Sequence, residues 1–503
     1  MSYYLAINIG PIGLTLSMAR KPREFWQASY LFSHLMKCLL DSFSQESQLT
    51  LLSPQIKEED NKEVSTSSCK VKAGIYPDRA FFKSATPIAD EIVSQRITKG
   101  LDKFAEDICF PQGIEYTKKI VRDYFHVMTA SCDSGTDREA VSQLNNWLNG
   151  LELSVHAPQP GTVDEISQLL QKKFDSPLFR LAFGEKRFDV ETLENIAEYE
   201  IKALGAFPKT YHKYICIVQA DGDGMGEVVT HLPDGELTKI SGQLASFGRQ
   251  ACQTIAEYGG MPIYAGGDDL LFIAPVWGEK EQRRSIFDLM DTLDTYYINT
   301  VSKPVEALGM KNDKEKAIVT NMSFGLSVTY AKFPLYEAWQ YAADQLFGKA
   351  KRNWEQKHAL AWKLQKHSGS GFEGDLTRED AELYKAFKEL LCIPAPERIV
   401  SAVAHKLRAN EGLLALLEDK TDAEYSKRLD AFFKEVIDIE GKDDTALLYL
   451  EQVKNLLKET RKSLKHKKQS SSQPDETPAA RLVSTVYGML RTAKFFIGEE
   501  EKL

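Results

Sequence analysis

The sequence predicts an α+β fold that has a ferredoxin-like strand order in its middle part and an α-helical bundle at its C-terminal end. Two observations support this prediction. Between residues 214 and 330, short apolar runs and amphipathic helices follow one another in the order β-α-β-β-α-β, which is the order of a ferredoxin-like domain. From residue 373 onward only the helical spacing of apolar residues recurs, and this is typical of a helical bundle.

The composition is typical of a soluble protein of several domains. The chain has 503 residues, of which 43% are apolar and 27% are charged. No apolar run is long enough to span a membrane, and the first residues lack the features of a signal peptide, so we expect a cytoplasmic protein. The formal charge of -9 provides no general attraction to nucleic acid, so phosphate groups must be bound by local basic clusters or by a metal ion in an acidic site.

The seven cysteines are scattered along the chain, and their odd number argues against a framework of disulfides. No two of them have the C-x-x-C spacing of a common structural zinc site. We therefore expect small hydrophobic side chains and free thiols at these positions.

The N-terminal part begins with a strand and continues with helices. Residues 3–9 read as a strand that Gly10 and Pro11 interrupt, and residues 19–43 read as a long helix rich in aromatic and aliphatic side chains. Helical periodicity then dominates residues 88–204.

The middle part supplies the ferredoxin-like strand order. Its elements are, in order, a strand at residues 214–220, a helix at 237–258, strands at 262–265 and 270–274, a helix at 282–301 and a strand at 321–330. The two middle strands flank a tight turn and therefore read as a hairpin. In such a unit the first strand and the hairpin lie side by side, so the end of the strand and the hairpin turn meet at one edge of the sheet.

Acidic residues occupy both of the segments that meet there. The first strand runs into Ala-Asp-Gly-Asp at residues 220–223, and the hairpin turn is Gly-Gly-Asp-Asp at residues 266–269. Carboxylates held this close repel one another unless a cation lies between them, and Mg²⁺ suits the site because it combines few carboxylates with water and phosphate oxygens. We predict that Asp221, Asp268 and Asp269 bind two Mg²⁺ (or Mn²⁺) ions and serve an in-line displacement that joins nucleotides.

The glycines beside these carboxylates fit the same chemistry. Gly222, Gly266 and Gly267 leave the backbone amides open to the close approach of a triphosphate, which a side chain would block. Asp223 is a weaker candidate for the same site. The alternative is that both segments are acidic surface turns, because Asp and Gly are common turn residues.

Other motifs of similar appearance are rejected. Residues 221–232 resemble the start of a calcium-binding EF-hand loop, but Met225 and Leu232 occupy positions that need ligands. The glycine-rich string at residues 369–374 matches G-x-G-x-x-G without leading from a strand to a helix, so we interpret it as a flexible linker.

Several segments, taken in order, resemble one known family. The two acidic turns, the segment Ile-Tyr-Pro-Asp at residues 75–78 and the segment Ser-Phe-Gly at residues 323–325 are similar to motifs of the CRISPR polymerase-cyclase large subunits (the Cas ten family) in their type III-B branch. The resemblance implies an α+β fold with two ferredoxin-like (palm) domains, helical insertions and a C-terminal α-helical bundle. The implied domains are an N-terminal palm-like domain at residues 1–110, a helical linking domain at 111–208, a catalytic palm at 209–370 and the helical bundle at 371–503.

The resemblance also implies an activity and further site residues. Such subunits convert ATP into a 3′-5′-linked adenylate messenger when target RNA is bound. The product is a cyclic oligoadenylate or AMP conjugated to S-adenosylmethionine. In addition to the three aspartates as metal ligands, the resemblance places Ser323 and Gly325 near the base or ribose, and Lys349 or Lys351 near the triphosphate.

The implied partners are the other subunits of a type III-B effector complex, a guide RNA and a target RNA, with no membrane. Many relatives carry an HD nuclease domain, which needs adjacent His and Asp residues. None of the nine histidines is followed by Asp, and the palm-like domain begins at residue 1, so we expect no HD domain and no DNA cleavage by one. A basic cluster at residues 454–468 is either an RNA contact or, more simply, a solvated helix end.

Two other functions stay open. A diguanylate-cyclase-like enzyme has a similar palm, but its motif continues with Glu-Phe where this chain has Asp269 and Leu270. A catalytically silent scaffold subunit of the same complex would have no physical use for intact carboxylates that repel one another. The favoured prediction is therefore an RNA-activated nucleotidyltransferase that uses ATP.

Overall fold

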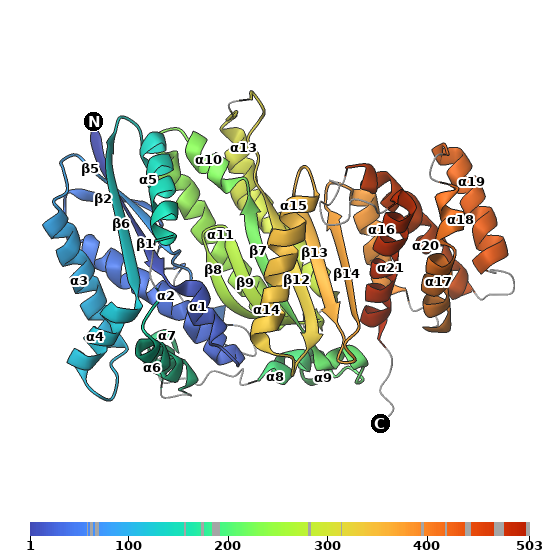
Figure 1. The fold of residues 1–503 in the computed structure, drawn as a ribbon, viewed down its shortest axis with the longest axis horizontal. Coiled ribbons are helices and arrows are strands. Elements are labelled where there is room, and N and C mark those ends of the chain that lie inside the picture. Colours follow the sequence, from blue (N-terminus) through green and yellow to red (C-terminus); the bar gives the residue numbers. More distant parts are fainter. Residues whose placement is uncertain are drawn as a thin grey trace.

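The computed structural model has two sheets with ferredoxin-like strand order and a helical bundle at the C-terminal end (Figure 1). It describes the whole chain except residues 58, 61–63, 66–69, 155–156, 173–175, 184–191, 280–282, 313, 394–396, 418–419, 438–443, 467–476 and 499–503. The predicted α+β class with two ferredoxin-like domains is confirmed.

The first sheet lies in the N-terminal part of the chain. Its strands are β1 (Ser2–Gly10), β2 (Leu49–Ser53), β5 (Arg79–Ser84) and β6 (His126–Ser134). They are arranged in the order β2-β5-β1-β6, which is ferredoxin-like. The helices of this part are α1 (Ile12–Ser17), α2 (Pro22–Phe43), α3 (Asp90–Asp107), α4 (Ile114–Tyr124) and α5 (Asp137–Glu152).

Alternate residues of β1 are buried on opposite faces of the first sheet. Leu5 and Ile7 share a hydrophobic core with apolar residues of α2 and α3, whereas Tyr4 and Ala6 share one with residues of α5. Both faces are therefore covered by helices, which explains why the strand reads as a nearly continuous apolar run.

The expected helical linking domain at residues 111–208 also contains a strand, β6, which belongs to the first sheet. This strand pairs antiparallel with all of β1, from Ser134 opposite Ser2 to His126 opposite Gly10. Most of its side chains are partly exposed because it is an edge strand, so the segment lacks the apolar pattern by which a strand is recognised. The rest of that region is helical, with α6 (Pro160–Gln171), α7 (Pro177–Phe183), α8 (Leu193–Ala197) and α9 (Tyr199–Leu204).

The second sheet has six strands in the order β14-β13-β12-β7-β9-β8. They are β7 (Tyr214–Asp223), β8 (Met261–Gly266), β9 (Asp269–Pro275), β12 (Asn321–Tyr330), β13 (Ala359–Gln365) and β14 (Gly371–Thr377). The part β12-β7-β9-β8 has the predicted ferredoxin-like order. The helices of this part are α10 (Met225–His231), α11 (Glu236–Tyr258), α12 (Ile286–Tyr297), α13 (Lys303–Ala307), α14 (Leu335–Ala343) and α15 (Lys351–Asn353), with π-helical turns η2 (Ile298–Ser302) and η3 (Asp344–Ala350).

The glycine-rich string at residues 369–374 is not a linker. It runs into β14, which pairs antiparallel with β13 from Gln365 opposite Gly371 to Ala359 opposite Thr377. A Cβ atom at Gly374 would lie 2.2 Å from the ring of Trp362, so this glycine makes room for a buried tryptophan. The helical bundle therefore begins after β14, later than residue 371.

The C-terminal bundle packs against β14 and the adjacent part of the sheet. Its main helices are α16 (Ala381–Cys392), α17 (Glu397–Ala409), α18 (Glu411–Ala415), α19 (Asp422–Phe432), α20 (Asp444–Ser463) and α21 (Pro478–Ile497). The indole of Trp362 donates a hydrogen bond of 2.8 Å to Thr492 Oγ1, and that of Trp277 donates one of 3.0 Å to the carbonyl oxygen of Phe496. Helix α21 is thus fixed to the sheet along its C-terminal half. No helix in the described part of the chain is long and apolar enough to cross a bilayer.

The basic cluster is largely paired within this bundle. Lys454 forms an ion pair of 2.9 Å with Asp430, and Arg461 forms one of 2.7 Å with Asp422. The cluster's last residues, 467 and 468, lie outside the described residues.

The two sheets are joined by direct contacts of α2 and of Gly74 with the edge strand β8. Ser29 Oγ donates a hydrogen bond of 3.0 Å to the carbonyl oxygen of Ile263. The amide of Ala265 donates one of 2.8 Å to the carbonyl oxygen of Gly74. These contacts bring the N-terminal domain against the strand that leads into the acidic hairpin turn.

Candidate active site

The acidic cluster forms where β7 ends beside the turn between β8 and β9. Ala220 pairs with Leu270, and the amide of Gly222 donates a hydrogen bond of 3.2 Å to the carbonyl oxygen of Asp268. The two acidic turns therefore lie at the same end of the sheet. Asp221, Asp268 and Asp269 are close enough for each carboxylate charge to influence the others.

The pKa values of Asp268 and Asp269 are both raised. Burial raises the pKa of Asp268 to about 7, and the charge of Asp221 adds to this effect. Loss of water around the carboxylate raises the pKa of Asp269 well above its usual range, with further contributions from Asp268 and Asp221. A divalent cation would remove this cost, because it stabilises the ionised form of all three groups. The atoms available to coordinate a metal ion are carboxylate oxygens, which suit Mg²⁺ or Mn²⁺.

Two glycines are required by the geometry of these turns. A Cβ atom at Gly222 would lie 2.6 Å from Tyr297 Oη and 2.7 Å from Asp268 Oδ2, so no side chain fits there. Gly267 has φ +66°, a left-handed conformation that favours glycine. The conformations of both turns therefore depend on glycine.

Lys351 is the basic residue that the structure brings to the cluster. Its Nζ lies 2.5 Å from Asp221 Oδ1, and it donates a hydrogen bond of 3.2 Å to the carbonyl oxygen of Gly222. Lys349 instead forms an ion pair with Glu373 on β14, so the prediction that places it near a triphosphate is not supported. Residues two positions apart on a helical turn point in different directions, which separates the two lysines.

Asp223 and Ser323 lie behind the cluster and bond to each other. Ser323 Oγ donates a hydrogen bond of 2.6 Å to Asp223 Oδ2, which also accepts one of 3.0 Å from the amide of His358. Ser323 is completely buried and also accepts a hydrogen bond from the amide of Ala359. The prediction that Ser323 lies beside the base or ribose is therefore corrected, because its hydroxyl is enclosed in the protein.

Gly325 allows a helix to pack closely against its strand, β12. A Cβ atom at this position would lie 2.2 Å from the carbonyl oxygen of Ala342 and 2.4 Å from the amide nitrogen of Leu346. The glycine lets the end of α14 and the start of η3 rest directly on β12. It does not face a nucleotide pocket as the resemblance implies.

A cavity of about 310 Å³ opens beside Asp221 and Asp269, between the two ferredoxin-like domains. The second domain contributes the carboxylates, and its aromatic side chains in the wall include Trp339 and Phe347. Phe32 of α2 contributes from the first domain. A cavity with aromatic walls and an acidic cluster at its side is of the kind that can accommodate a nucleotide.

Asp78 is a fourth carboxylate that sequence reasoning did not assign to the site. It belongs to the first domain and lines the same cavity. Burial raises its pKa, and its charge in turn adds to the raised pKa of Asp268 and Asp269. The sequence analysis used residues 75–78 only as a family motif, and it is the docking of the two domains that places Asp78 near the cluster.

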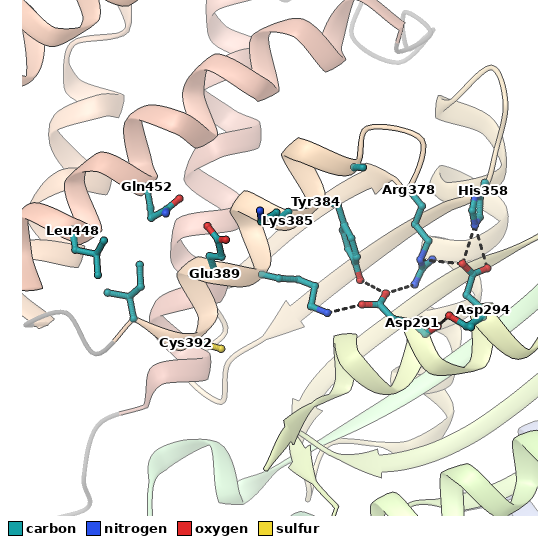
Figure 2. A pocket seen from close by; sticks show the side chains of 14 residues that line it. Asp291, Asp294, His358, Arg378, Tyr384, Lys385, Glu389, Cys392, Leu448 and Gln452 are labelled. Carbon is teal, nitrogen blue, oxygen red and sulfur yellow. Dashed lines mark hydrogen bonds and ion pairs between the residues drawn. The ribbon is translucent and has the colours of Figure 1, made fainter. Parts of the chain in front are cut away.

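A second group of missed residues lies behind Asp223, at the junction with the C-terminal bundle. The amide of His358 binds Asp223, and its ring binds Asp294 at 2.9 Å and Glu379 at 2.8 Å. Figure 2 shows this ring beside Arg378, which forms an ion pair of 3.1 Å with Asp291. Burial by itself lowers the pKa of His358, but the bonds to Asp294 and Glu379 raise it overall. These residues border a cavity of about 980 Å³ whose far wall belongs to α16 and α20.

Two family models match the chain. The model of the second palm domain of Cas10/Cmr2 matches residues 214–361, which include the acidic cluster. The model of the N-terminal part of the CRISPR-associated protein Cmr2 matches residues 4–109, in the first domain.

A related protein sequence supports the same family. The CRISPR system Cmr subunit Cmr2 of Pyrococcus furiosus is 27% identical over 226 residues, which cover 39% of this chain and 23% of that protein. The match thus spans about a quarter of the relative's length.

Solved structures share the fold. A chain of the type III-B Cmr-beta complex in the apo state has a TM-score of 0.53 and 10% identity, with coverage of 89% of this chain and 78% of that chain. The Csm1-Csm4 cassette in complex with one ATP has a TM-score of 0.50 and 12% identity, with coverage of 98% and 70%. With family models on both ferredoxin-like domains and a related Cmr2 sequence, the chain belongs to the Cas10/Cmr2 family of CRISPR-associated proteins.

Proposed function

We propose that the chain is the nucleotidyltransferase subunit of a type III-B RNA-guided complex and converts ATP into a 3′-5′-linked adenylate messenger when target RNA is bound. The observation that carries this proposal is the cluster of Asp221, Asp268 and Asp269, of which Asp221 and Asp269 line a cavity between two ferredoxin-like domains. Ionisation of Asp268 and Asp269, whose pKa values are raised, costs the folded protein free energy that a bound cation would relieve, and such shifts are typical of functional sites.

Each part of the site has a proposed role. Asp221, Asp268 and Asp269 would hold two Mg²⁺ or Mn²⁺ ions, which activate a 3′-hydroxyl and stabilise the departing pyrophosphate when bound. Lys351 supplies a positive charge that can move from Asp221 to the phosphates of a nucleotide. Gly267, which has no atom within 4 Å of an added Cβ, leaves room for phosphate oxygens near the backbone of the hairpin turn.

The aromatic wall supports a purine nucleotide as the substrate. Trp339 Nε1 donates a hydrogen bond of 3.1 Å to Gln219 Oε1, which holds the indole at the edge of the cavity. Phe347 is 43% exposed, so its ring is available for stacking. The ATP carried by the Csm1-Csm4 cassette, which shares the fold, supports ATP as that nucleotide.

The partners follow from the family. A relative of the same fold has been solved within the type III-B Cmr-beta complex bound to cognate target RNA, with a TM-score of 0.53. We therefore propose that this chain assembles with other effector subunits, a guide RNA and a target RNA in the cytoplasm.

The acceptor of the AMP group is either a second ATP or S-adenosylmethionine. The assembled complex is incubated with labelled ATP, Mg²⁺ and target RNA, with and without S-adenosylmethionine, and the products are identified by mass spectrometry. Cyclic oligoadenylate without S-adenosylmethionine would identify ATP as the acceptor, whereas a conjugate that needs it would identify the methionine compound. Absence of any adenylate product, at full assembly and target binding, would contradict the proposal and favour a scaffold role.

A further inference from the structure

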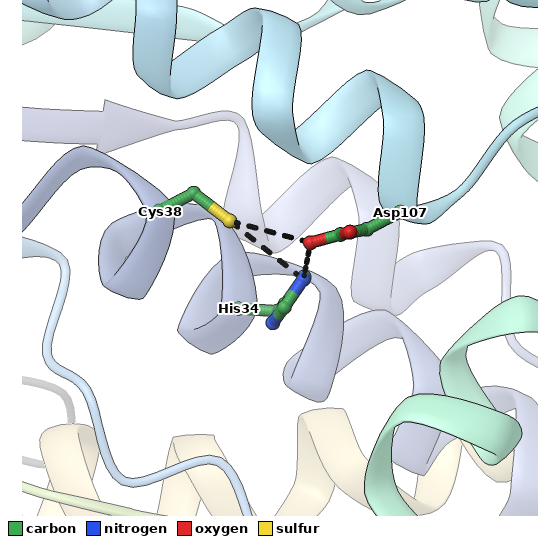
Figure 3. A group of neighbouring side chains, drawn as sticks. All are labelled: His34, Cys38 and Asp107. Carbon is green, nitrogen blue, oxygen red and sulfur yellow. Dashed lines mark hydrogen bonds and ion pairs between the residues drawn. The ribbon is translucent and has the colours of Figure 1, made fainter. Parts of the chain in front are cut away.

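His34, Cys38 and Asp107 form a compact group in the first domain (Figure 3). All three residues are far from the acidic cluster in the sequence. We propose that these three residues bind a zinc ion that ties α2 to α3. His34 and Cys38 are four positions apart on α2, so both side chains lie on one face of that helix. Asp107 is the last residue of α3.

The distances between the three ligand atoms suit one ion. His34 Nε2 lies 2.9 Å from Asp107 Oδ2, and Cys38 Sγ lies 3.7 Å from His34 Nε2 and 3.8 Å from Asp107 Oδ2. Tetrahedral zinc with ordinary bond lengths separates such ligand atoms by about 3.3–3.7 Å. A shift of a few tenths of an ångström at His34 and Asp107 is enough to admit the ion.

Neighbouring groups already hold the ligands in the required orientation. Lys103 binds Asp107 Oδ1 at 2.6 Å, so the other oxygen is left facing His34 and Cys38. The His34 ring stacks on Tyr30 and lies against Phe104, with centroid distances of 6.3 and 5.9 Å. Such orienting partners are typical of ligands that bind a metal.

The chemistry of the three groups selects zinc. A thiolate and an imidazole are ligands for zinc and not for Mg²⁺, which takes oxygen atoms. Burial raises the pKa of the Cys38 thiol to about 12, so the thiol stays protonated unless a metal ion takes the place of the proton. The side chains of His34 and Asp107 are 10% and 15% exposed, which leaves an approach for the ion and for a water molecule as fourth ligand.

The position of the site indicates how a bound zinc ion would affect the cavity between the two domains. Helix α2 carries Ser29, which bonds to β8, and Phe32, which lines the cavity between the domains. Ser33 Oγ, next to His34, accepts hydrogen bonds from the amides of Ile75 and Tyr76. A tie between α2 and α3 would therefore stiffen the wall of the nucleotide cavity from the first domain.

The test uses the full chain, freed of metal and then titrated with Co²⁺ as a spectroscopic substitute for Zn²⁺. We expect a sulfur-to-cobalt charge-transfer band that reaches its limit at one Co²⁺ per chain and that Zn²⁺ abolishes by displacement. The band is expected to disappear in Cys38→Ser. Binding should weaken at least about tenfold in His34→Ala and in Asp107→Asn.

Cys109→Ser is the matched control, because this exposed cysteine is only two residues from Asp107 and has no partner set of this kind among the described residues. It should keep the full band. Binding of Co²⁺ to the acidic cluster involves no sulfur and produces no such band. A wild-type chain without the band, or a band that persists in Cys38→Ser, would overturn the proposal.

Discussion

At the scale of single residues, the acidic cluster brings together carboxylates whose negative charges repel one another. Asp221, Asp268 and Asp269 lie together because the strand ends on which they stand are paired, not because the carboxylates attract one another. In the metal-free chain the pKa of Asp268 is raised to about 7, so ionisation of this group lowers the stability of the folded state. Function and stability therefore oppose one another at this position.

Asp268→Asn should stabilise the folded protein when no metal is bound. The same substitution should abolish nucleotidyl transfer by the assembled complex, because it removes a proposed metal ligand. An acid whose pKa is raised on folding loses stability as the pH rises from about 4 through the folded-state value. We expect the variant to be more stable than the wild type by on the order of 1–2 kcal/mol at pH 8, and by much less at pH 5. Thermal unfolding at both pH values measures this, with Asp90→Asn, an exposed change on α3, as the control. Equal melting temperatures at pH 8 would contradict the electrostatic account.

His358→Gln should change the pH dependence of stability in the opposite sense. The pKa of His358 is raised in the folded state, so its bonds to Asp294 and Glu379 contribute fully below about pH 6.5 and are lost as the pH rises through the folded-state value. The wild type should exceed the variant by on the order of 1 kcal/mol at pH 6, and the difference should shrink by pH 8.5. Urea unfolding measures it, with the exposed His405→Gln as control. A difference that is constant with pH would refute this role.

Single residues also show which parts of the candidate site can be predicted from the sequence. The aspartates and glycines of the two turns were predictable, because strand order alone places those turns together. Ser323 and Gly325 were assigned by resemblance, yet their surroundings depend on how β12 packs against Asp223 and α14. Asp78 and His358 were not predictable as neighbours of the cluster, since long-range packing brings them there.

At the scale of elements, the sequence analysis did not predict several strands, among them the edge strands β6 and β14. β6 has mostly half-exposed side chains, and β14 begins with exposed residues and two glycines. Strands that are buried on both faces, such as β7, have the long apolar runs that identify them. Edge strands are recognised by their partners, which the sequence of the strand itself does not contain.

The close contact of α14 and η3 with β12 predicts the effect of replacing Gly325. Gly325→Ala should destabilise the chain by about 1–3 kcal/mol, because its Cβ would collide with backbone atoms of Ala342 and Leu346. Gly242→Ala is the matched control, since this helical glycine of α11 has no atoms within 4 Å of an added Cβ. The control should stabilise by up to about 1 kcal/mol. Denaturant unfolding of both variants measures the contrast, and equal effects would contradict this packing role.

At the scale of the whole molecule, the cavity beside the acidic cluster belongs to neither domain alone. The first domain contributes Phe32 and Asp78, and the second contributes Asp221, Asp269 and Trp339. Contacts between α2 and β8 hold the two parts together. Phe25 of α2 also packs edge-on against Trp339 at a centroid distance of 5.7 Å. Any movement of the first domain relative to the second therefore changes the shape of the cavity.

Trp339→Ala should weaken ATP binding without removing the catalytic groups. Stacking of a base on an aromatic ring contributes about 1–3 kcal/mol, so we expect KM for ATP to rise about tenfold or more while kcat changes little. The comparison variant is Trp147→Ala, which alters a tryptophan on α5 that is 45% exposed. Steady-state kinetics of the assembled complex measure KM for ATP. The same KM for both variants would contradict the proposal that the base of ATP stacks on Trp339.

The central claim is that the carboxylates at the ends of β7 and the β8-β9 turn carry out nucleotidyl transfer. The most direct measurement is the initial rate of target-dependent ATP consumption by complexes assembled with the wild type, with Asp268→Ala/Asp269→Ala, or with Asp90→Ala/Glu91→Ala. The last variant removes an adjacent acidic pair of equal charge from the exposed start of α3. We predict a loss of more than about a hundredfold for the first variant, because metal ligation supplies several kcal/mol of transition-state stabilisation, and a rate close to wild type for the second. Equal rates for all three complexes would contradict the account.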